Sequence, residues 1–384
     1  MNIEVVSVVT VIIIVCIVVV IIGFVYLLMT FYPPFGGKTP REKLTKQIHR
    51  SNYFNGRFFN TLPTSVSNGM GVTISMLVKF IKGNPQGRPS VPLPVELVDP
   101  HFVKENQQDY VIWFGHSALL VVINGIKLLI DPMLGNSPSP FPFLGGKRYG
   151  KLPMEIEDMP TIDAIILSHD HYDHLDYGSM LKLKEKVKHF FVPLGVGAHL
   201  ERWGISQARI TEMDWWEEAG FEGLTLACTP ARHFSGRKFV DKEATLWCSW
   251  VICGEQTKLF FSGDSGYSPH FKEIGQKYGP FDMTLMECGQ YDERWAGVHM
   301  FPEQTIQAQV DVQGKLMIPI HWCGFTLAFH DWTDPVERAL KAAKEHDVHI
   351  STPRIGEIVW MGSSNYPVST WWRELITHNN LSGK

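Results

Sequence analysis

Four apolar, strand-like runs in this sequence each end at a residue that can bind a metal ion. The run IDAIILS is followed by His169, LTLACTPAR by His233, KLFFSG by Asp264, and GKLMIPI by His321. Sheets with parallel strands gather the loops that follow several strands along one edge, so residues far apart in the chain can converge there. The pattern therefore predicts a layered sheet structure with a polar site at one sheet edge.

The first of these residues opens a dense group of titratable side chains, LSHDHYDHLD, at residues 167–176. Together with the later strand ends, this group supplies seven potential ligands: His169, His171, Asp173, His174, His233, Asp264 and His321. Imidazole and carboxylate donors without thiolate suit zinc, with iron and manganese as alternatives. A purely structural zinc site is disfavoured, because such sites are usually closed tetrahedra rich in cysteine.

The number of donors bears on the number of metal ions. Seven donors are too many for one tetrahedral zinc ion, but they suit two ions that share a carboxylate. Two ions bridged by an aspartate would acidify a shared water near neutral pH and hold the attacking and leaving oxygens of a hydrolysis. We therefore expect a dinuclear hydrolytic site.

A long uncharged segment lies near the N-terminus. No charged residue occurs at positions 5–37, and residues 5–29 are almost entirely apolar. As a helix, this run would be about 37 Å long, enough to cross a hydrocarbon core of about 30 Å. A cleaved signal peptide fits less well, because the run is too long and no basic residues precede it. We expect a transmembrane anchor over residues 1–32.

The charges that flank the anchor predict its orientation. Only Glu4 precedes it, whereas five basic residues follow: Lys38, Arg41, Lys43, Lys46 and Arg50. By the positive-inside rule, the protein is a single-pass membrane protein whose catalytic domain is cytoplasmic. Residues 33–105, which include GNPQGRPSVPLPVELVDP, are expected to form a basic and proline-rich linker. The hydrolase domain is then expected over residues 106–384.

Short apolar runs dominate the chain after residue 109. The runs YVIWF, ALLVVING and IKLLIDP predict a meander of strands with an Asn-Gly turn at 124–125. Helical patterns then alternate with strands, at residues 177–187, 269–278, 302–312 and 335–346. This order indicates an α/β domain of two sheets covered by helices.

These features resemble the metallo-β-lactamase fold superfamily, whose hallmark is HxHxDH followed by a distal His, Asp and His. Over about residues 111–360 the chain is most similar to the N-acyl-phosphatidylethanolamine-hydrolysing phospholipase D family and its bacterial relatives. The similar stretches are WFGHSALLV, HDHYDHLDY, FVPLG, DWWEE, SGDSGYSPHFKEIG, GPFD and IHW. The resemblance implies a four-layer αββα sandwich after the transmembrane helix, two zinc ions and a membrane phospholipid as substrate.

The resemblance also implies a role for each ligand. His169, His171 and His233 would hold one zinc ion. Asp173, His174 and His321 would hold the other, with Asp264 between the two ions. Asp173 and Asp264 thereby become catalytic as well as metal-binding residues.

Three further residues match family positions near the metals. His299, in GVHMFPEQ, matches a catalytic histidine beside the substrate phosphate, although a structural role, such as capping the helix that begins near Pro302, is equally open. His116 and Asp131 match positions where a neighbouring group orients a ligand imidazole. For His116, a hydrogen-bonded core histidine is the favoured interpretation.

The chain departs from the animal lipase in several places. Asp170 replaces a neutral residue inside the HxHxDH motif, and Cys323 follows the last ligand where the family has no cysteine. The loop LGNSPSPFPFLGGKRY, at residues 134–149, ends in Lys147 and Arg148. This loop could line an acyl groove while Lys147 and Arg148 pair with a substrate phosphate, or it could pack as a lid.

Charge and membrane attachment narrow the expected function. With 35 basic and 39 acidic residues, the net charge is −4, which gives no basic footprint for nucleic acid and disfavours a ribonuclease. We expect a phospholipase D-type phosphodiesterase that cleaves (N-acyl) glycerophospholipids to phosphatidic acid and headgroup. The alternative is a hydrolase of small soluble esters such as a sugar-phosphate lactone. A non-catalytic metal-binding protein is least expected, because the full ligand set would have no evident use.

Overall fold

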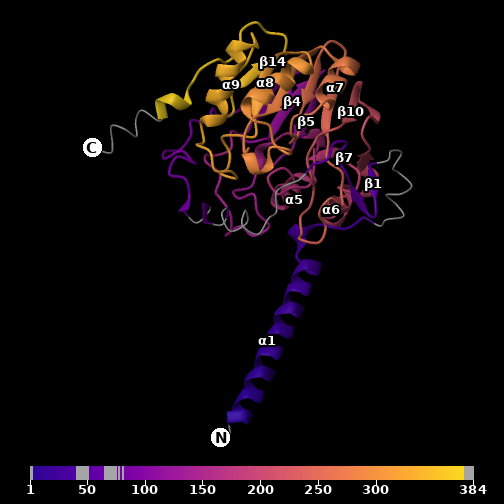
Figure 1. Cartoon of the computed structure of the whole chain (residues 1–384). Helices are drawn as coiled ribbons and strands as arrows, with labels where there is room; N and C mark the ends of the chain where they lie inside the picture. Colours follow the sequence, from indigo (N-terminus) through magenta and orange to yellow (C-terminus); the bar gives the residue numbers. More distant parts are fainter. Residues whose placement is uncertain (1–2, 40–51, 65–75, 77, 80–81, 376–384) are drawn as a thin grey trace.

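The N-terminal helix stands apart from the rest of the protein in the computed structural model, which describes residues 3–39, 52–64, 76, 78–79 and 82–375 (Figure 1). Helix α1 (Ile3–Phe31) projects from one face of a layered body. Its segment Val8–Phe31 is long and apolar enough to cross a membrane. Of the five basic residues predicted to orient it, Lys38 is described, and Arg41, Lys43, Lys46 and Arg50 lie outside the described residues.

Two β-sheets form the body. The seven-stranded sheet has the order β15 (Ile358–Trp360), β3 (Tyr110–Trp113), β4 (Leu119–Ile123), β5 (Ile126–Ile130), β6 (Ile162–Ile166), β7 (Val187–Pro193) and β8 (Ile210–Met213). Its β15 to β5 half is antiparallel, and β5 to β8 are parallel. The predicted meander is confirmed as β3–β4–β5, with the turn at residues 124–125 between β4 and β5.

The second sheet has six strands. Their order is β14 (Gly314–Ile320), β13 (Phe281–Glu287), β12 (Lys258–Phe261), β11 (Ser249–Cys253), β10 (Leu224–Thr229) and β9 (Glu218–Phe221). Strands β9 to β12 pair antiparallel, whereas β12, β13 and β14 are parallel. The carboxyl ends of these parallel strands therefore lie at one edge of the sheet.

Three separate apolar cores divide the body into four layers. Successive residues of a strand face opposite sides of its sheet. In β4, Leu119 and Val121 accordingly pack into the core between the sheets, while Leu120 and Val122 pack outside the seven-stranded sheet. A third core lies outside the six-stranded sheet. The predicted αββα sandwich is confirmed.

Helices cover both outer faces (Figure 1). One outer layer contains α5 (Tyr177–Leu183) and α6 (Gly197–Arg202), and the other contains α7 (His270–Tyr278), α8 (Pro302–Asp311) and α9 (Asp334–Glu345). The remaining short elements are η1 (Pro33–Phe35), β1 (Tyr53–Phe54), β2 (Arg57–Phe58), α4 (Pro100–Glu105), η2 (Ile156–Asp158), η3 (Gln207–Arg209) and η4 (Glu293–Trp295).

The four predicted helices correspond to α5, α7, α8 and α9, with one clear error at an end. Helix α5 begins where Asp176 accepts a hydrogen bond from the backbone nitrogen of Ser179 at 2.7 Å, as a helix N-cap does. It ends at Leu183 rather than at residue 187. Val187 is already the first residue of β7, because a tight turn joins the two elements, in which the nitrogen of Lys186 donates to the carbonyl of Leu183.

The described parts of the segment between α1 and the sandwich lie against the sandwich. Phe58, on β2, is completely buried in the core between the sheets, and Leu93 belongs to the same core. Thr39 donates to the carbonyl of Gly195 at 3.0 Å. This segment is thus attached to the catalytic body at several places.

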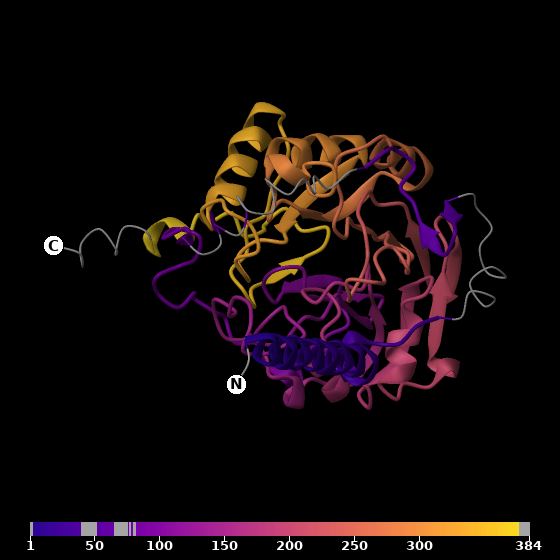
Figure 2. The ribbon, with the colours of Figure 1, turned by 60° about the horizontal axis from the view of Figure 1, so that its bottom comes forward.

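The end of α1 is fixed to the same body (Figure 2, which turns this face forward). Arg202 donates to the carbonyl of Thr30 at 2.8 Å, and the indole of Trp203 donates to the carbonyl of Pro33 at 2.8 Å. On the other side, the ring of Tyr32 stacks on Phe141 with centroids 5.2 Å apart. The body therefore has a defined orientation relative to the end of α1.

Arg237 joins this junction to the HxHxDH loop. Its buried guanidinium donates to the carbonyls of Pro34, Asp170 and Leu175 at 2.6–3.0 Å, and lies over the ring of Tyr172. The Arg237→Met variant leaves these buried carbonyls unpaired, so we expect a loss of about 3 kcal/mol in the free energy of unfolding. That loss would lower the unfolding temperature in detergent by about 5–10 °C.

The matched control is Arg354→Met, because Arg354 is partly exposed and has one ion pair at 3.5 Å, with Glu96. Such exposed pairs contribute little to stability. Equal unfolding temperatures for the two variants would contradict the joining role of Arg237.

Candidate metal centre

All seven predicted ligands lie together at the edge where the two sheets meet. His169 and the rest of the motif follow β6, His233 follows β10, Asp264 follows β12 and His321 follows β14. Their donor atoms fall into groups in which every pair lies within 4.8 Å. Most of these side chains are buried, so the loops after the strands form a polar site inside an otherwise apolar fold.

Three imidazoles form the first donor set. Nε2 of His169 lies 2.9 Å from Nδ1 of His171, which lies 3.2 Å from Nε2 of His233. Nitrogens bound to one tetrahedral zinc ion lie about 3.3 Å apart, so this spacing fits a shared ion. Burial lowers the pKa of His171 to about 4 and holds the pKa values of His169 and His233 well below the usual range. The three rings are therefore neutral at pH 7 and can offer lone pairs to a cation.

Asp173, His174 and His321 form the second set. Nε2 of His174 lies 3.4 Å from Oδ2 of Asp173. Burial opposes ionisation of Asp173, but His174 and His116 outweigh it and hold the pKa of Asp173 well below its usual value. Nε2 of His174 and Oδ1 of Asp264 are buried and make no hydrogen bond of good geometry among the described residues, although each has a polar contact at 3.0–3.2 Å. Buried polar atoms without a hydrogen bond are rare in folded proteins, and a bound cation would satisfy these two.

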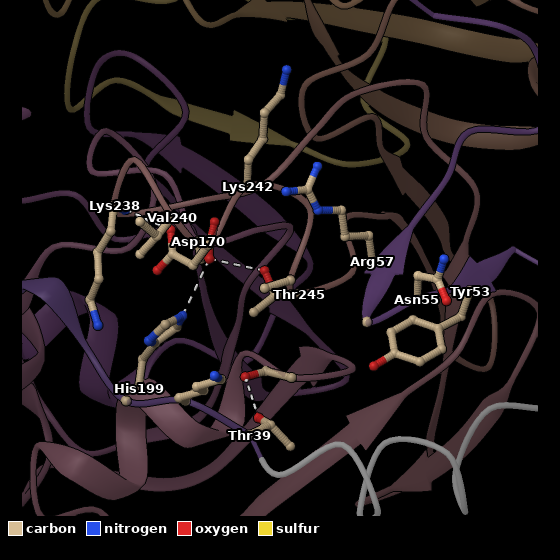
Figure 3. Close-up of a pocket in the computed structure, with 16 residues that line it drawn as sticks. Thr39, Tyr53, Asn55, Arg57, Asp170, His199, Lys238, Val240, Lys242 and Thr245 are labelled. Atoms are coloured by element: carbon tan, nitrogen blue, oxygen red, sulfur yellow. Dashed lines mark hydrogen bonds and ion pairs between the residues drawn. The ribbon is translucent and has the colours of Figure 1, made fainter.

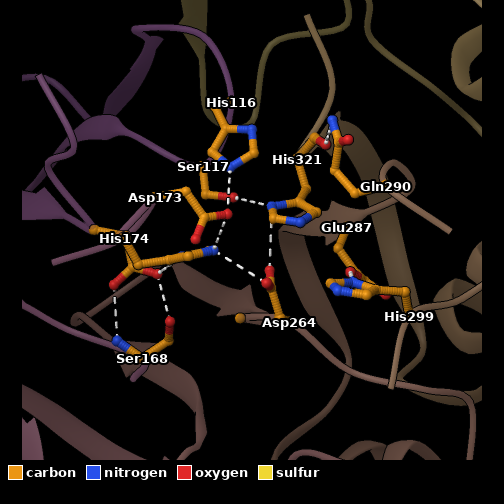
Figure 4. Close-up of polar contacts among 12 residues, drawn as sticks. His116, Ser117, Ser168, Asp173, His174, Asp264, Glu287, Gln290, His299 and His321 are labelled. Carbon is orange, nitrogen blue, oxygen red and sulfur yellow. Dashed lines mark hydrogen bonds and ion pairs between the residues drawn. The ribbon is translucent and has the colours of Figure 1, made fainter. Parts of the chain in front are cut away.

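Asp264 approaches residues of both sets, and its contacts with His174 and His321 of the second set are drawn in Figure 4. Its Oδ2 is 3.0 Å from Nε2 of His174 and 3.7 Å from Nε2 of His169, and its Oδ1 is 3.2 Å from Nδ1 of His321. Burial raises the pKa of Asp264 to about 6. The turn that presents Asp264 requires glycine at position 263. Gly263 has a φ of +56°, and a Cβ there would lie 2.6 Å from the carbonyl oxygen of Cys248.

Several side chains orient the ligands. Oδ2 of Asp131 contacts Nδ1 of His174 at 2.7 Å, which is the orienting contact predicted for this carboxylate. Nε2 of His116 contacts Oδ2 of Asp173 at 2.9 Å, so this buried histidine is hydrogen-bonded in the core and also holds a ligand. The hydroxyl of Ser117 contacts Nδ1 of His321 at 3.0 Å, a contact that was not predicted.

His299 is paired with a glutamate that sequence reasoning missed. Its Nδ1 lies 2.9 Å from Oε2 of Glu287, the last residue of β13, and its ring lies between those of His233 and His321. Burial raises the pKa of Glu287 well above its usual value. The helix-capping alternative for His299 is wrong, because its Nδ1 is held by Glu287 and the nitrogen of Phe301 donates to the side chain of Gln304.

A second missed residue comes from the segment that precedes the sandwich. The side chain of Asn60 donates to the carbonyl of His233 at 2.7 Å and accepts from its nitrogen at 3.1 Å. This pair of bonds fixes the backbone of a ligand. The sequence holds no signal for it, because Asn60 lies in a region that was expected to be a linker.

The contacts of Arg148 differ from the predicted contact with a substrate phosphate. Its guanidinium donates to the carbonyls of Gly135, Phe114 and Met133, and burial lowers its pKa to about 10. Arg148 therefore fastens the 134–149 loop to the sandwich. Lys147 is exposed, and its substrate role stays a prediction.

The two residues that depart from the family pattern are not among the grouped donors. Asp170 accepts from the nitrogen of Gly236 at 2.8 Å and from the hydroxyl of Thr245 at 2.9 Å. Cys323 is buried, and burial raises the pKa of its thiol well above its usual value. Among the described residues, neither side chain belongs to a donor group that could hold a metal ion.

Comparison with known families decides what this site belongs to. Residues 127–322, about half of the chain, match the model of the beta-lactamase superfamily domain. The chain belongs to the metallo-β-lactamase superfamily. An uncharacterised protein of Mycobacterium tuberculosis is 38% identical over 84% of this chain and 87% of its own length.

Two further matches place the chain within the superfamily. The N-acyl-phosphatidylethanolamine-hydrolyzing phospholipase D 1 of Caenorhabditis elegans is 32% identical over 71% of this chain and 81% of its own length. The solved structure of Igni18, a metallo hydrolase from Ignicoccus hospitalis, covers 67% of this chain and 100% of its own, with a TM-score of 0.53 and 21% identity. The chain is therefore a metallo-hydrolase of the β-lactamase fold, with a site for divalent metal of the kind that is typically dinuclear in this superfamily.

Proposed function

We propose that this protein is a membrane-anchored phospholipase D-type phosphodiesterase that cleaves (N-acyl) glycerophospholipids to phosphatidic acid and the headgroup alcohol. The observation that carries the proposal is the position of Asp264 between two three-donor sets, with the His299–Glu287 pair beside it. The name of the Caenorhabditis elegans relative supports a phospholipid as substrate, and α1 supports a location at a membrane.

The donor set would hold two zinc ions, one on His169, His171 and His233 and one on Asp173, His174 and His321, with Asp264 shared. When bound, two such ions supply Lewis acidity to the phosphodiester and to the attacking water. Asp131 and His116 would keep two of these ligands in position, because Asp131 contacts Nδ1 of His174 and His116 contacts Oδ2 of Asp173.

His299 has the position of a proton donor to the departing alcohol. Burial raises the pKa of Glu287 well above its usual value, which favours the protonated carboxyl as a hydrogen-bond donor to Nδ1 of His299. The proton of the imidazole then resides on Nε2. As Nε2 passes this proton to the leaving oxygen, Nδ1 takes the proton of Glu287, so the ring stays neutral and Glu287 becomes a carboxylate.

Hydrolysis in oxygen-18 water tests the reaction. We expect the label in phosphatidic acid, because water attacks phosphorus and the headgroup departs with its own oxygen. Label in the headgroup alcohol would mean attack at carbon. Label in a released fatty acid or in an opened lactone would mean attack at a carbonyl, and would transfer the protein to the class of soluble-ester hydrolases.

The side of the membrane on which the site lies is a separate part of the proposal. With Lys38 and the further basic residues up to position 50 after the anchor, we expect the sandwich in the cytoplasm and access to the inner leaflet. A reporter that functions only in the cytoplasm should be active when it is fused to the C-terminus. Activity of a reporter that works only outside the cell would reverse the orientation.

A further inference from the structure

A second cavity, of about 320 Å³, lies beside the point where the chain leaves α1 (Figure 3). It is lined by the segment after α1, by the β1–β2 hairpin, by His199 of α6 and by the loop that follows Arg237. None of the seven metal-ligand positions lines it. The nearest link between the two sites is Asp170, which lines the cavity and lies between the predicted ligands His169 and His171 in the sequence. The cavity is therefore distinct from the metal centre.

Its lining carries an excess of positive charge. Four cationic side chains line the cavity, against two carboxylates: Lys38, Arg57, Lys238 and Lys242, against Asp170 and Asp241. In Figure 3, Arg57 and Lys238 lie on opposite sides of the view. Burial, together with the charges of Arg202 and Lys38, lowers the pKa of Lys238 despite the opposing effect of Asp241. Lys38 and Lys238 thus lie close enough to repel each other.

Both carboxylates are occupied by hydrogen bonds from the protein itself. Asp241 accepts from the backbone nitrogens of Arg237 and Lys238 at 3.0 and 2.6 Å, and Asp170 accepts from Gly236 and Thr245. Among the described residues, no carboxylate lies within 4.0 Å of the charged groups of Lys38, Arg57 or Lys238, while Lys242 has only Glu243, at 4.0 Å. Lys38, Arg57 and Lys238 thus line a concave space and have no ion pair within 4.0 Å among the described residues, with Asp241 as the charge that acts on Lys238. Such an arrangement favours binding of an anion.

The cavity also lies next to the membrane that α1 would cross. Lys38 lies seven positions after Phe31, the last residue of α1, so it is at most about 25 Å of extended chain from the helix end. Phe239, directly after Lys238, is fully exposed, and Phe143, on the loop that stacks against Tyr32, is 82% exposed. Exposed aromatic rings and basic residues together at the base of a membrane helix are typical of the interfacial region of a bilayer.

We propose that this cavity binds the phosphate-bearing headgroup of an anionic phospholipid from the same membrane, as a site separate from the substrate site at the metals. The volume is in the range of small-molecule sites, and basic residues at a membrane surface attract anionic lipids. The inference requires α1 to lie in a membrane, but it does not depend on the reaction proposed for the metal centre.

The test uses the full chain, with its metals, in a non-ionic detergent. Lipid binding is measured by native mass spectrometry after addition of phosphatidylglycerol or phosphatidylcholine. We expect wild-type protein to retain phosphatidylglycerol in preference to phosphatidylcholine. The double variant Arg57→Gln with Lys238→Gln should bind phosphatidylglycerol about 30-fold more weakly, because each basic residue near an anionic surface contributes about fivefold.

Two variants control this comparison. Lys344→Gln removes an exposed cation from α9, remote in sequence and fold from the cavity, and should bind lipid as the wild type does. Lys38→Gln with Lys242→Gln removes the other two cations of the cavity and should repeat the loss. Metal content must equal that of the wild type in every variant, which excludes misfolding as the cause.

The outcomes separate the possible ligands. Unchanged phosphatidylglycerol binding in both cavity variants would place the lipid elsewhere, for example at the metal centre, and overturn the proposal. Displacement of the lipid by an equal concentration of inorganic phosphate would identify a free-phosphate site and overturn the lipid assignment. A loss of lipid binding with normal turnover would support the cavity site whichever substrate the metal centre hydrolyses.

Discussion

Replacing Asp264 by asparagine is expected to remove metal and activity together. Asp264 is the only one of the seven predicted ligands whose oxygens approach donors of both sets. A neutral amide cannot supply the negative charge that two cations share. Because loss of an orienting partner alone costs about 10–100-fold in metal affinity or activity, loss of the shared ligand should reduce turnover by about 1,000-fold or more.

Elemental analysis of purified protein provides the measurement. The wild type should contain two metal ions per chain, most of them zinc, and Asp264→Asn should contain fewer than one. Asp347→Asn is the matched control, because Asp347 is exposed after α9, has a φ of +54° that asparagine tolerates, and belongs to no donor group. One metal ion in fully active wild-type protein would reject the dinuclear site, and iron or manganese would correct the identity of the metal.

The strand-end pattern correctly predicted the layered fold. It also predicted that the seven expected residues lie together, and this prediction has a physical basis. Apolar runs of strand length, each followed by a polar donor, place that donor at the same edge of the sheet whenever the strands run in parallel. The same rule would have found Glu287, which ends the apolar strand FDMTLME. Its partner His299 lies 12 positions away in the sequence, so no local pattern joins the two residues.

Other features depend on contacts between segments that the local pattern does not reveal. Asn60 holds His233 from 173 positions away, and Ser117 reaches His321 across 204 positions. For Arg148, the sequence left open whether it pairs with a substrate phosphate or belongs to a loop that packs as a lid. Its position was instead decided by three carbonyl groups that the fold leaves in need of donors.

Asp170 illustrates how a departure from a family pattern can be explained only by tertiary structure. In the sequence it is an additional acid within a metal-binding motif. In the structure its side chain points away from the grouped donors, and it contacts His199 at 3.2 Å, Thr245 and the backbone of Gly236. It thereby ties the loop that carries two metal ligands to the wall of the cationic cavity, where its charge is balanced by hydrogen bonds.

The His299→Ala variant is expected to lower kcat by about 100-fold or more, the usual contribution of a general acid, while two metal ions remain bound. The Nδ1 of His299 is held by Glu287, and His299 belongs to neither three-donor set, so its removal should leave both sets intact. If Nε2 protonates the departing alcohol, the defect must depend on the leaving group. A phosphodiester with a 4-nitrophenol leaving group, which departs without protonation, should therefore restore most of the lost rate. Equal losses for both substrates would assign His299 to substrate positioning, and an unchanged kcat with the natural headgroup would remove it from the reaction.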